Sequence, residues 1–369
     1  MASFFGIAGR RYSYSLLVAA LFGADSRLGA RQIFMAVGTD RGSRSSELIT
    51  LMTADLEAVS NRVLEVTELS YPVASSVIRE IVLAGGKRLR PMLVLLAGRP
   101  FAYDANFDEL ITAAAGVELL HVASLVHDDT IDRAALRRGK PTLNSVMSVG
   151  GTILVGDFLF AQSAMLAART GDVRVVSVFA ATLGDLCDGQ LNELFDAHRL
   201  DQDIDTYMRR ISGKTASLYS GAAEMGAILG RTDAATIADI RSFAHDIGLA
   251  FQIQDDVLDL TSDDIELGKP VGNDLRQGTV TLPTLLYAKR IDLHGDEGQL
   301  LRHVVTDDTF ADDEVDELIA AIRASGAIED ARAESERLHT RALTRLDVLG
   351  DSEHRENLIR WADLALTTA

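Results

Sequence analysis

Apolar side chains recur every three or four residues along most of the chain, and this spacing predicts α-helices. The clearest stretches cover residues 110–125, 152–168, 175–195, 207–229 and 236–260. Proline is absent between Thr142 and Lys269 and after Pro283, so nothing breaks helices over those lengths. No segment shows the period-two alternation of a half-buried strand. We therefore predict an all-α fold.

Glycine, proline and acidic clusters predict where the helices end. The pair Gly85-Gly86 ends one helix, and Pro91 suits the first turn of the next. Loops are expected over 138–141 and 268–273. The acidic run 307–314 reads as a loop that leads into a helix N-terminus, where carboxylates are favoured. Because no internal linker is visible, we predict a single domain over residues 47–369.

The first 46 residues differ in charge from the rest of the chain. They hold six arginines and only two acidic residues, whereas the whole chain has a formal net charge of −18. The apolar run Leu16–Phe22 is too short to span a bilayer. We interpret residues 1–46 as a basic, disordered extension. A targeting segment, or a true start at Met35, stays open, and no membrane span is expected elsewhere.

Charge and cysteine content limit the partners and the compartment. The strongly acidic balance argues against non-specific nucleic-acid binding. Cys187 is the single cysteine, so no disulfide forms within the chain. A reducing compartment follows, and we predict a cytoplasmic location.

An Asp-Asp-x-x-Asp motif occurs twice, each time at the end of a long apolar helix: Asp128, Asp129 and Asp132, then Asp255, Asp256 and Asp259. Residues four apart share one face of a helix, so the first and last carboxylates of each motif lie close together and repel. Because this repulsion occurs in both motifs, we expect a bound cation to offset it. Oxygen ligands without His or Cys favour Mg²⁺, which commonly joins carboxylates to a substrate phosphate.

Basic residues cluster beside these carboxylates. Three cations follow Gly85-Gly86, two arginines and a lysine follow the first motif, and Lys214 and Lys269 lie in or near the later helices. Each alone reads as an ordinary surface charge. Together, in so acidic a chain, they indicate phosphate recognition with a bridging metal. The glycine turn lacks the spacing of a Walker loop.

From about residue 50 to the end, the chain resembles the trans-isoprenyl diphosphate synthases, also called polyprenyl synthetases. The matching segments are GGKRLRP (85–91), HVASLVHDDTIDRAALRRG (121–139), GD (156–157), GQ (189–190), KTASL (214–218), FQIQDDVLD (251–259), GKPVGNDL (268–275) and TLP (281–283). The resemblance implies a helical bundle around a central cavity. It implies Mg²⁺-assisted condensation of isopentenyl diphosphate with an allylic diphosphate.

The resemblance also implies residue roles. Isopentenyl diphosphate would be held by Lys87, Arg90, His121 and Arg138. Three Mg²⁺ ions would be ligated by Asp128, Asp132 and Asp255, with Asp129, Asp256 and Asp259 as further ligands or as residues around them. The allylic diphosphate would be held by Arg137, Lys214 and Lys269, and the allylic cation would lie near Thr215 and Gln252. One departure is Thr279, where the family usually has lysine; either a phosphate contact is lost or Arg276 replaces it.

Small residues before the first motif bear on product length. Ala123 and Ser124 lie five and four residues before Asp128, where short-chain relatives carry a bulky aromatic floor. The resemblance therefore implies a medium- or long-chain product, with geranylgeranyl diphosphate as the alternative.

Two other classes of protein fit the sequence less well. A terpene cyclase would not need the isopentenyl diphosphate anchors or the second motif, and a non-catalytic subunit of a heteromeric synthase should have lost aspartates. The resemblance also implies a homodimer, and peripheral membrane contact stays open for an enzyme with a lipid product.

Overall fold

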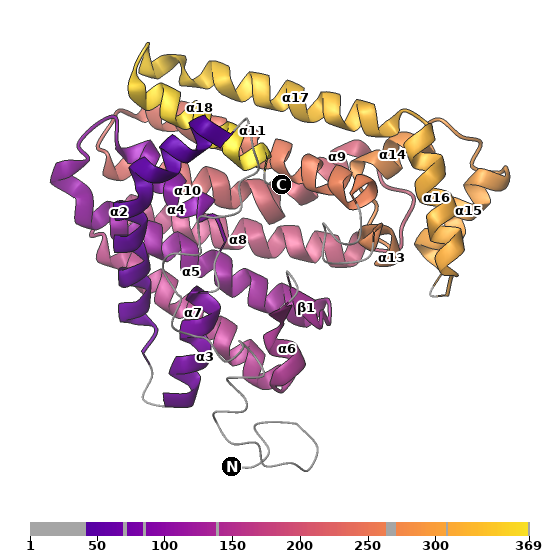
Figure 1. The fold of residues 1–369 in the computed structure, drawn as a ribbon, viewed down its shortest axis with the longest axis horizontal. Helices are drawn as coiled ribbons and strands as arrows, with labels where there is room; N and C mark the ends of the chain where they lie inside the picture. The colour runs from indigo at the N-terminus through magenta and orange to yellow at the C-terminus, as the bar shows by residue number, and fades with distance from the viewer. Residues whose placement is uncertain are drawn as a thin grey trace. The chain divides into compact units, whose positions relative to one another are not determined.

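A computed structural model of the chain describes residues 42–68, 72–83, 86–137, 140–262, 271–307 and 309–367 (Figure 1). The described chain is almost entirely helical, which confirms the predicted all-α class. Its contacts form two compact units: one holds the chain to Phe179 with Ala222–Asp233, and the other holds Ala180–Gly221 with the chain from Ala234. The single domain stays a prediction. Residues 1–41 of the predicted extension lie outside the described residues, and the first described helix, α2, begins at Gly42.

The first unit is built around one helix that is apolar on all sides. Its helices are α2 (Gly42–Val66), α3 (Pro72–Leu83), α4 (Leu89–Gly98), η1 (Asp104–Asn106), α5 (Phe107–Ile131), α6 (Leu143–Val146) and α7 (Val149–Arg169), with the start of α8 (Val173–Asp196) and the end of α10 (Ser217–Leu229). α5 is buried almost continuously from Leu110 to Ala123 and packs chiefly against α7, α4 and α2. A helix without a polar face belongs in a core, and α5 ends at the first aspartate motif.

Two short strands interrupt the helical pattern. β1 (Leu136–Arg137) pairs antiparallel with β2 (Lys140–Pro141), with Leu136 opposite Pro141. The prediction of a loop over 138–141 was therefore wrong for Lys140 and Pro141, which form β2. Strands of two residues are too short to show any alternation, so hydrophobic patterning could not reveal them.

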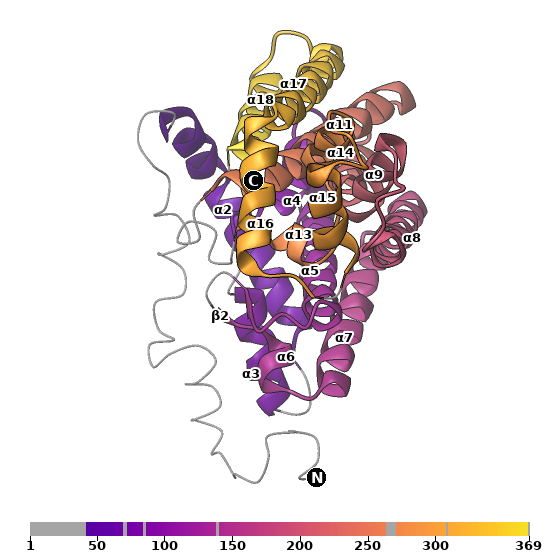
Figure 2. The same ribbon diagram turned by 90° about the vertical axis from the view of Figure 1, so that its right-hand side faces the viewer.

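The second unit centres on α11 (Ala234–Thr261), which ends with the second motif. Its other elements are α9 (Ile204–Ile211), the π-helical segment η2 (Ser212–Ala216), α13 (Asn273–Arg276), α14 (Leu282–Ala288), α15 (Asp296–Thr306), α16 (Asp312–Ala324), α17 (Ala327–Arg345), η3 (Leu346–Leu349) and α18 (Glu353–Leu366). α17 runs along α11, and α15 lies beside α16 (Figures 1 and 2). The predicted acidic N-terminus is confirmed in α16, whose first turn holds Asp312, Asp313 and Glu314.

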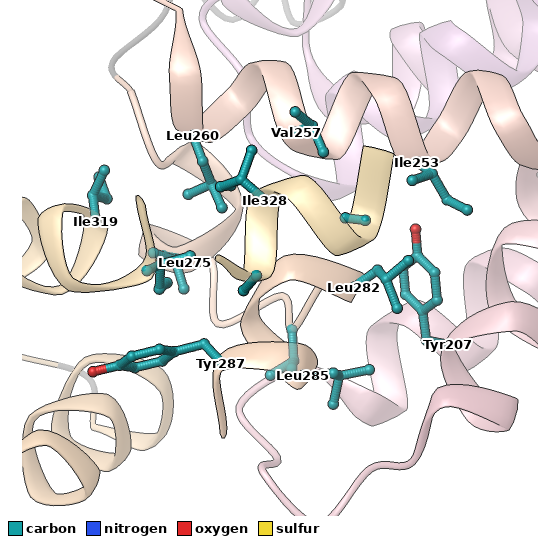
Figure 3. Close-up of a cluster of buried hydrophobic side chains, with 14 of the residues drawn as sticks. Tyr207, Ile253, Val257, Leu260, Leu275, Leu282, Leu285, Tyr287, Ile319 and Ile328 are labelled. Carbon is teal, nitrogen blue, oxygen red and sulfur yellow. The ribbon is translucent and has the colours of Figure 1, made fainter. Parts of the chain in front are cut away.

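One apolar cluster joins the helices of this unit to the end of α11. It gathers side chains from α9, α11, α14, α16 and α17, among them Tyr207, Ile253, Val257, Leu282 and Ile328 (Figure 3). Trp361 of α18 is fully buried against Tyr219 and Phe243. Burying a side chain of this kind contributes roughly 1.5–3 kcal/mol. The carboxyl-terminal turns of α11 are thus held from several sides.

By length and composition alone, α5 and α7 are the two described helices that could cross a membrane. α5 is mostly buried within the protein, as a core helix is. α7 differs, because Val149, Ile153, Leu154 and Met165 are exposed along it.

Candidate active site

The predicted site residues divide between the two units, and the first aspartate motif lies in the first unit at the end of α5. The backbone N–H of Asp132 donates to the carbonyl of Asp128 at 2.8 Å, so helical geometry extends to the last aspartate. Asp128 is partly exposed and Asp132 is exposed. One helical turn separates them on one face, as predicted.

The middle aspartate of this motif has a different environment. Asp129 is buried, and its Oδ1 accepts a hydrogen bond of 2.8 Å from Nε of Arg137 on β1. Burial raises the pKa of Asp129, and the Arg137 guanidinium opposes part of that rise. Arg137, predicted to bind the allylic diphosphate, is thus paired with Asp129.

The cations before α4 separate into two kinds. Arg88 has φ of 53° and is buried, with its guanidinium on Glu118 and, at 2.6 Å, on the carbonyl of Val82. Lys87 is exposed beside it. The left-handed backbone of Arg88 thus goes with a side chain that turns into the core and forms a structural ion pair with Glu118. This agrees with leaving Arg88 out of the predicted site.

Arg90 and His121, both predicted to hold isopentenyl diphosphate, lie close together. Nη1 of Arg90 lies 3.3 Å from Nε2 of His121, although the two residues are on α4 and α5. Next to His121, Ala123 is fully buried, whereas Ser124 is partly exposed and donates to the carbonyl of His121 at 2.8 Å. Arg138 lies outside the described residues.

The first unit also gives a role to the Gly156-Asp157 segment. A Cβ on Gly156 would lie 2.3 Å from Nε2 of His127, so only glycine leaves room for that ring. The same nitrogen lies 3.2 Å from the carbonyl of Ile153 and 3.5 Å from Oδ1 of Asp157. His127 therefore ties the turn before the first motif to α7.

In the second unit, two glycines bring α8 against the π-helical segment. A Cβ on Gly189 would lie 2.2 Å from the backbone nitrogen of Lys214, and a Cβ on Gly213 would lie 2.9 Å from Cα of Gly189. This backbone contact places Lys214 and Thr215 on a π-helical turn, a feature found often at functional sites. Nζ of Lys214 is held by Glu193 of α8.

The second motif also has a buried middle aspartate, but its last aspartate is buried too, unlike Asp132 of the first motif. Asp255 is exposed, whereas Asp256 and Asp259 are buried. Oδ2 of Asp259 accepts the backbone N–H of Asp274 at 3.0 Å, and the Asp259 carbonyl accepts that of Gly272 at 2.8 Å. Asp259 thus anchors the segment that enters α13.

Asp256 lies in a chain of hydrogen bonds with Gln252 and Thr215. Nε2 of Gln252 donates to Oδ1 of Asp256 at 2.9 Å, and the Thr215 hydroxyl donates to Oε1 of Gln252 at 2.7 Å. The hydroxyl of Tyr207 donates to Oδ2 of Asp256 at 2.7 Å. Burial raises the pKa of Asp256, and the hydrogen bonds from Gln252 and Tyr207 oppose part of the rise.

Sequence reasoning missed four residues of this arrangement: Tyr207, Glu193, Gly156 and Gly189. The two glycines stood in quoted segments without a role, and their role is a close approach between helices. Arg276, considered as a replacement at the Thr279 position, is paired with Asp312 of α16 and lies 3.5 Å from the Val271 carbonyl. A phosphate-binding role would require breaking that pair. Lys269 lies outside the described residues.

The donor set fits Mg²⁺. Each motif offers exposed carboxylates (Asp128 and Asp132, then Asp255) and no soft ligand. Within the described ranges, no group of three or more His, Cys, Asp or Glu side chains could hold a metal ion by itself. Mg²⁺ keeps waters and takes few protein carboxylates, the remaining ligands coming from a substrate phosphate.

Comparison with known proteins shows which family the chain belongs to. The Polyprenyl synthetase family model matches residues 72–322. Heptaprenyl diphosphate synthase component 2 of Geobacillus stearothermophilus is 38% identical over 319 residues, 86% of this chain and 96% of that protein. Octaprenyl diphosphate synthase of Escherichia coli K12 is 33% identical over 323 residues, 87% of this chain and 98% of the relative.

A solved structure shares the fold as well. The polyprenyl synthase of Caulobacter crescentus CB15, complexed with calcium and isoprenyl diphosphate, has a TM-score of 0.82 at 30% identity, covering 88% of this chain and 97% of that one. Because the family model matches most of the chain and relatives of 38% and 33% identity span it, this protein belongs to the polyprenyl synthetase family.

Proposed function

We propose that this trans-prenyltransferase condenses isopentenyl diphosphate with an allylic diphosphate and makes a medium- or long-chain polyprenyl diphosphate. One observation carries the proposal. In both motifs the aspartates expected to bind Mg²⁺ are the exposed or partly exposed ones, while Asp129, Asp256 and Asp259 are buried and accept hydrogen bonds from the protein. An acidic helix end with a purely structural role would not need this separation into exposed and buried, hydrogen-bonded carboxylates.

The chemistry requires stabilisation of a diphosphate leaving group. Breaking the allylic carbon–oxygen bond concentrates negative charge on diphosphate, and fixed cations act best where that charge grows. Bound Mg²⁺, proposed at three ions, supplies further charge neutralisation there. We assign Arg137 and Lys214 to this role, and in the structure their side chains pair with Asp129 and Glu193 respectively. We propose that diphosphate replaces these carboxylates as their partner.

Thr215 and Gln252 would meet the other product of bond breaking. Their oxygens carry lone pairs, and they are joined to each other within the second unit. Preorganised dipoles of this kind stabilise a developing cation without reorganisation. Because diphosphate can accept the proton that leaves after bond formation, no side-chain base is needed.

We propose Lys87, Arg90, His121 and Arg138 as the isopentenyl diphosphate anchors. The Arg90–His121 pair supports this assignment, because its two nitrogens lie 3.3 Å apart on separate helices. A terpene cyclase has no use for such an anchor.

The small residues before the first motif support the longer product. We expect Ala123→Phe to shorten the main product and Ala123→Leu to shorten it less, because added bulk narrows the path of the growing chain. Ala123 is fully buried, so overpacking will also cost about 1–3 kcal/mol of folding stability. Chromatographic sizing of dephosphorylated products tests this, with thermal unfolding alongside. An unchanged product distribution in both variants would remove Ala123 as a length determinant.

We propose that a second copy of the chain covers the apolar face of α7. Val149, Ile153, Leu154 and Met165 are exposed along α7, and Val173 and Val176 are exposed at the start of α8. Several exposed apolar side chains on one segment favour an interaction site. A partner subunit is the alternative, since one relative is named as a component. We keep the cytoplasm as the proposed location.

The deciding experiment uses the purified full chain with labelled isopentenyl diphosphate, an allylic primer and Mg²⁺. We expect elongation without any other protein, loss of turnover with a chelator, and recovery on adding Mg²⁺. Light scattering on the same sample should give a dimer. Conversion of the primer alone to a hydrocarbon would identify a cyclase, and activity that appears only with a second protein would identify a heteromeric subunit.

A further inference from the structure

A buried tyrosine that no part of the proposed function uses lies beneath the second motif. Tyr207 of α9 is fully buried in the apolar cluster, and its hydroxyl points toward α11 (Figure 3). That hydroxyl is the only polar atom of the side chain, and it donates to Oδ2 of Asp256 at 2.7 Å. A hydrogen bond from a neutral donor to a buried carboxylate is stronger than one between neutral groups.

Asp256, held by the Tyr207 hydroxyl, in turn orients the amide of Gln252. With Oδ2 occupied by Tyr207, Oδ1 accepts Nε2 of Gln252 at 2.9 Å. This hydrogen bond means that the amide presents its NH₂ group to Asp256 and its oxygen to the other side. On that side, Oε1 accepts the hydroxyl of Thr215 at 2.7 Å. One amide orientation is therefore imposed.

The ring of Tyr207 is held from a second direction. The guanidinium carbon of Arg210 lies 5.5 Å from the ring centroid, and Arg210 is itself buried. Nη1 of Arg210 donates to Oε1 of Gln202 at 3.0 Å, and Nη2 donates to the carbonyl of Val280. The hydroxyl of Tyr207 therefore has little freedom to leave Asp256.

We infer that Tyr207 is a positioning residue for prenyl transfer, acting through Asp256 to hold Gln252 and Thr215 with their oxygens in one arrangement. Asp256 is then a positioning group, and Mg²⁺ ligation in the second motif falls to Asp255. The inference rests on the proposed function. It adds a residue that touches neither substrate nor metal.

The first test compares two tyrosines of the same cluster. Tyr207→Phe removes the hydroxyl that holds Asp256. Tyr287→Phe removes a hydroxyl that is also buried but finds no hydrogen-bond partner among the described residues. We expect Tyr207→Phe to lower kcat about tenfold, with KM for isopentenyl diphosphate and the half-saturating Mg²⁺ concentration changed less than about twofold. Tyr287→Phe should keep wild-type kcat. Equal losses in both variants would overturn the inference.

A double-mutant cycle shows whether Tyr207 acts through Gln252. If it does, Tyr207→Phe combined with Gln252→Ala should be no slower than Gln252→Ala alone, because the residue being positioned is already gone. A further loss of about tenfold in the double variant would overturn the inference while the wild type still elongates. A wild type that does not elongate would overturn the proposed function and this inference with it.

Circular dichroism will show whether Tyr207→Phe folds. If it does not, Asp256→Asn tests whether Asp256 positions Gln252. Asparagine can still accept from Tyr207, but it then presents NH₂ to Gln252 and forces that amide to flip. We expect a kcat loss of about tenfold with an unchanged Mg²⁺ requirement. A rise of about tenfold or more in half-saturating Mg²⁺ would make Asp256 a metal ligand and overturn the inference.

Discussion

Asp255→Asn is expected to reduce kcat by about 1,000-fold or more. The exposed carboxylate of the second motif is the residue we assign to Mg²⁺ in that unit, and a neutral amide would hold the ion far less well. Metal stabilisation of a leaving group contributes several kcal/mol, and about 4 kcal/mol corresponds to a factor of about 1,000. Steady-state incorporation of labelled isopentenyl diphosphate over a range of Mg²⁺ concentrations measures the loss.

Asp205→Asn is the matched control for this prediction. Asp205 is also an exposed helical aspartate of the second unit, in the first turn of α9 and outside both motifs. We expect it to keep wild-type kcat, so that a general effect of losing one negative charge is excluded. If Asp255→Asn kept more than about a tenth of the activity at saturating Mg²⁺, the second motif would not be a metal site.

Gly189→Ala is expected to reduce kcat by about 100-fold and to destabilise the fold. The added Cβ would lie 2.2 Å from the backbone nitrogen of Lys214, and backbone cannot rotate away as a side chain can. α8 and the π-helical segment must then separate, which displaces both Lys214 and Thr215. A shift of about 1 Å in catalytic groups costs about 100-fold in rate, and overpacking costs about 1–3 kcal/mol. Steady-state kinetics and denaturant unfolding measure the two effects.

Gly184→Ala separates the clash from the helix propensity of the new residue. Gly184 lies in the same helix, and a Cβ there would meet nothing within 4 Å. Alanine in an open helical position should stabilise the protein by about 0.5–1 kcal/mol and leave kcat unchanged. A Gly189→Ala variant as active as Gly184→Ala would show that close contact at Gly189 does not position Lys214.

Most helices could be predicted because their signal is local. The stretch 236–260, for example, carries helical spacing without a proline, and α11 spans Ala234–Thr261. The interval 207–229 was predicted as one helix, yet it contains a π-helical turn at Ser212–Ala216. That turn coincides with the backbone contact to Gly189, a residue more than twenty positions earlier, which no local pattern encodes.

The sequence predicted the residues of the candidate site, and the resemblance implied their roles, but neither predicted which protein groups they pair with. The spacing of Asp128 and Asp132 places both on one helix face whatever surrounds them. The pairing of Arg137 with Asp129, and of Lys214 with Glu193, depends on which segments fold against each other. The role of Tyr207 was not predicted, because no pattern near it in the sequence indicates the hydrogen bond to Asp256.

The sequence by itself determined the helical class, the two aspartate motifs and the family, since each of these is written in short-range spacing and order. Only the tertiary structure decided which aspartates are exposed and which are held by the protein. Exposure and hydrogen bonding arise from contacts between residues far apart in the chain. Asp255 and Asp256 are adjacent, yet packing against α9 buries only the second.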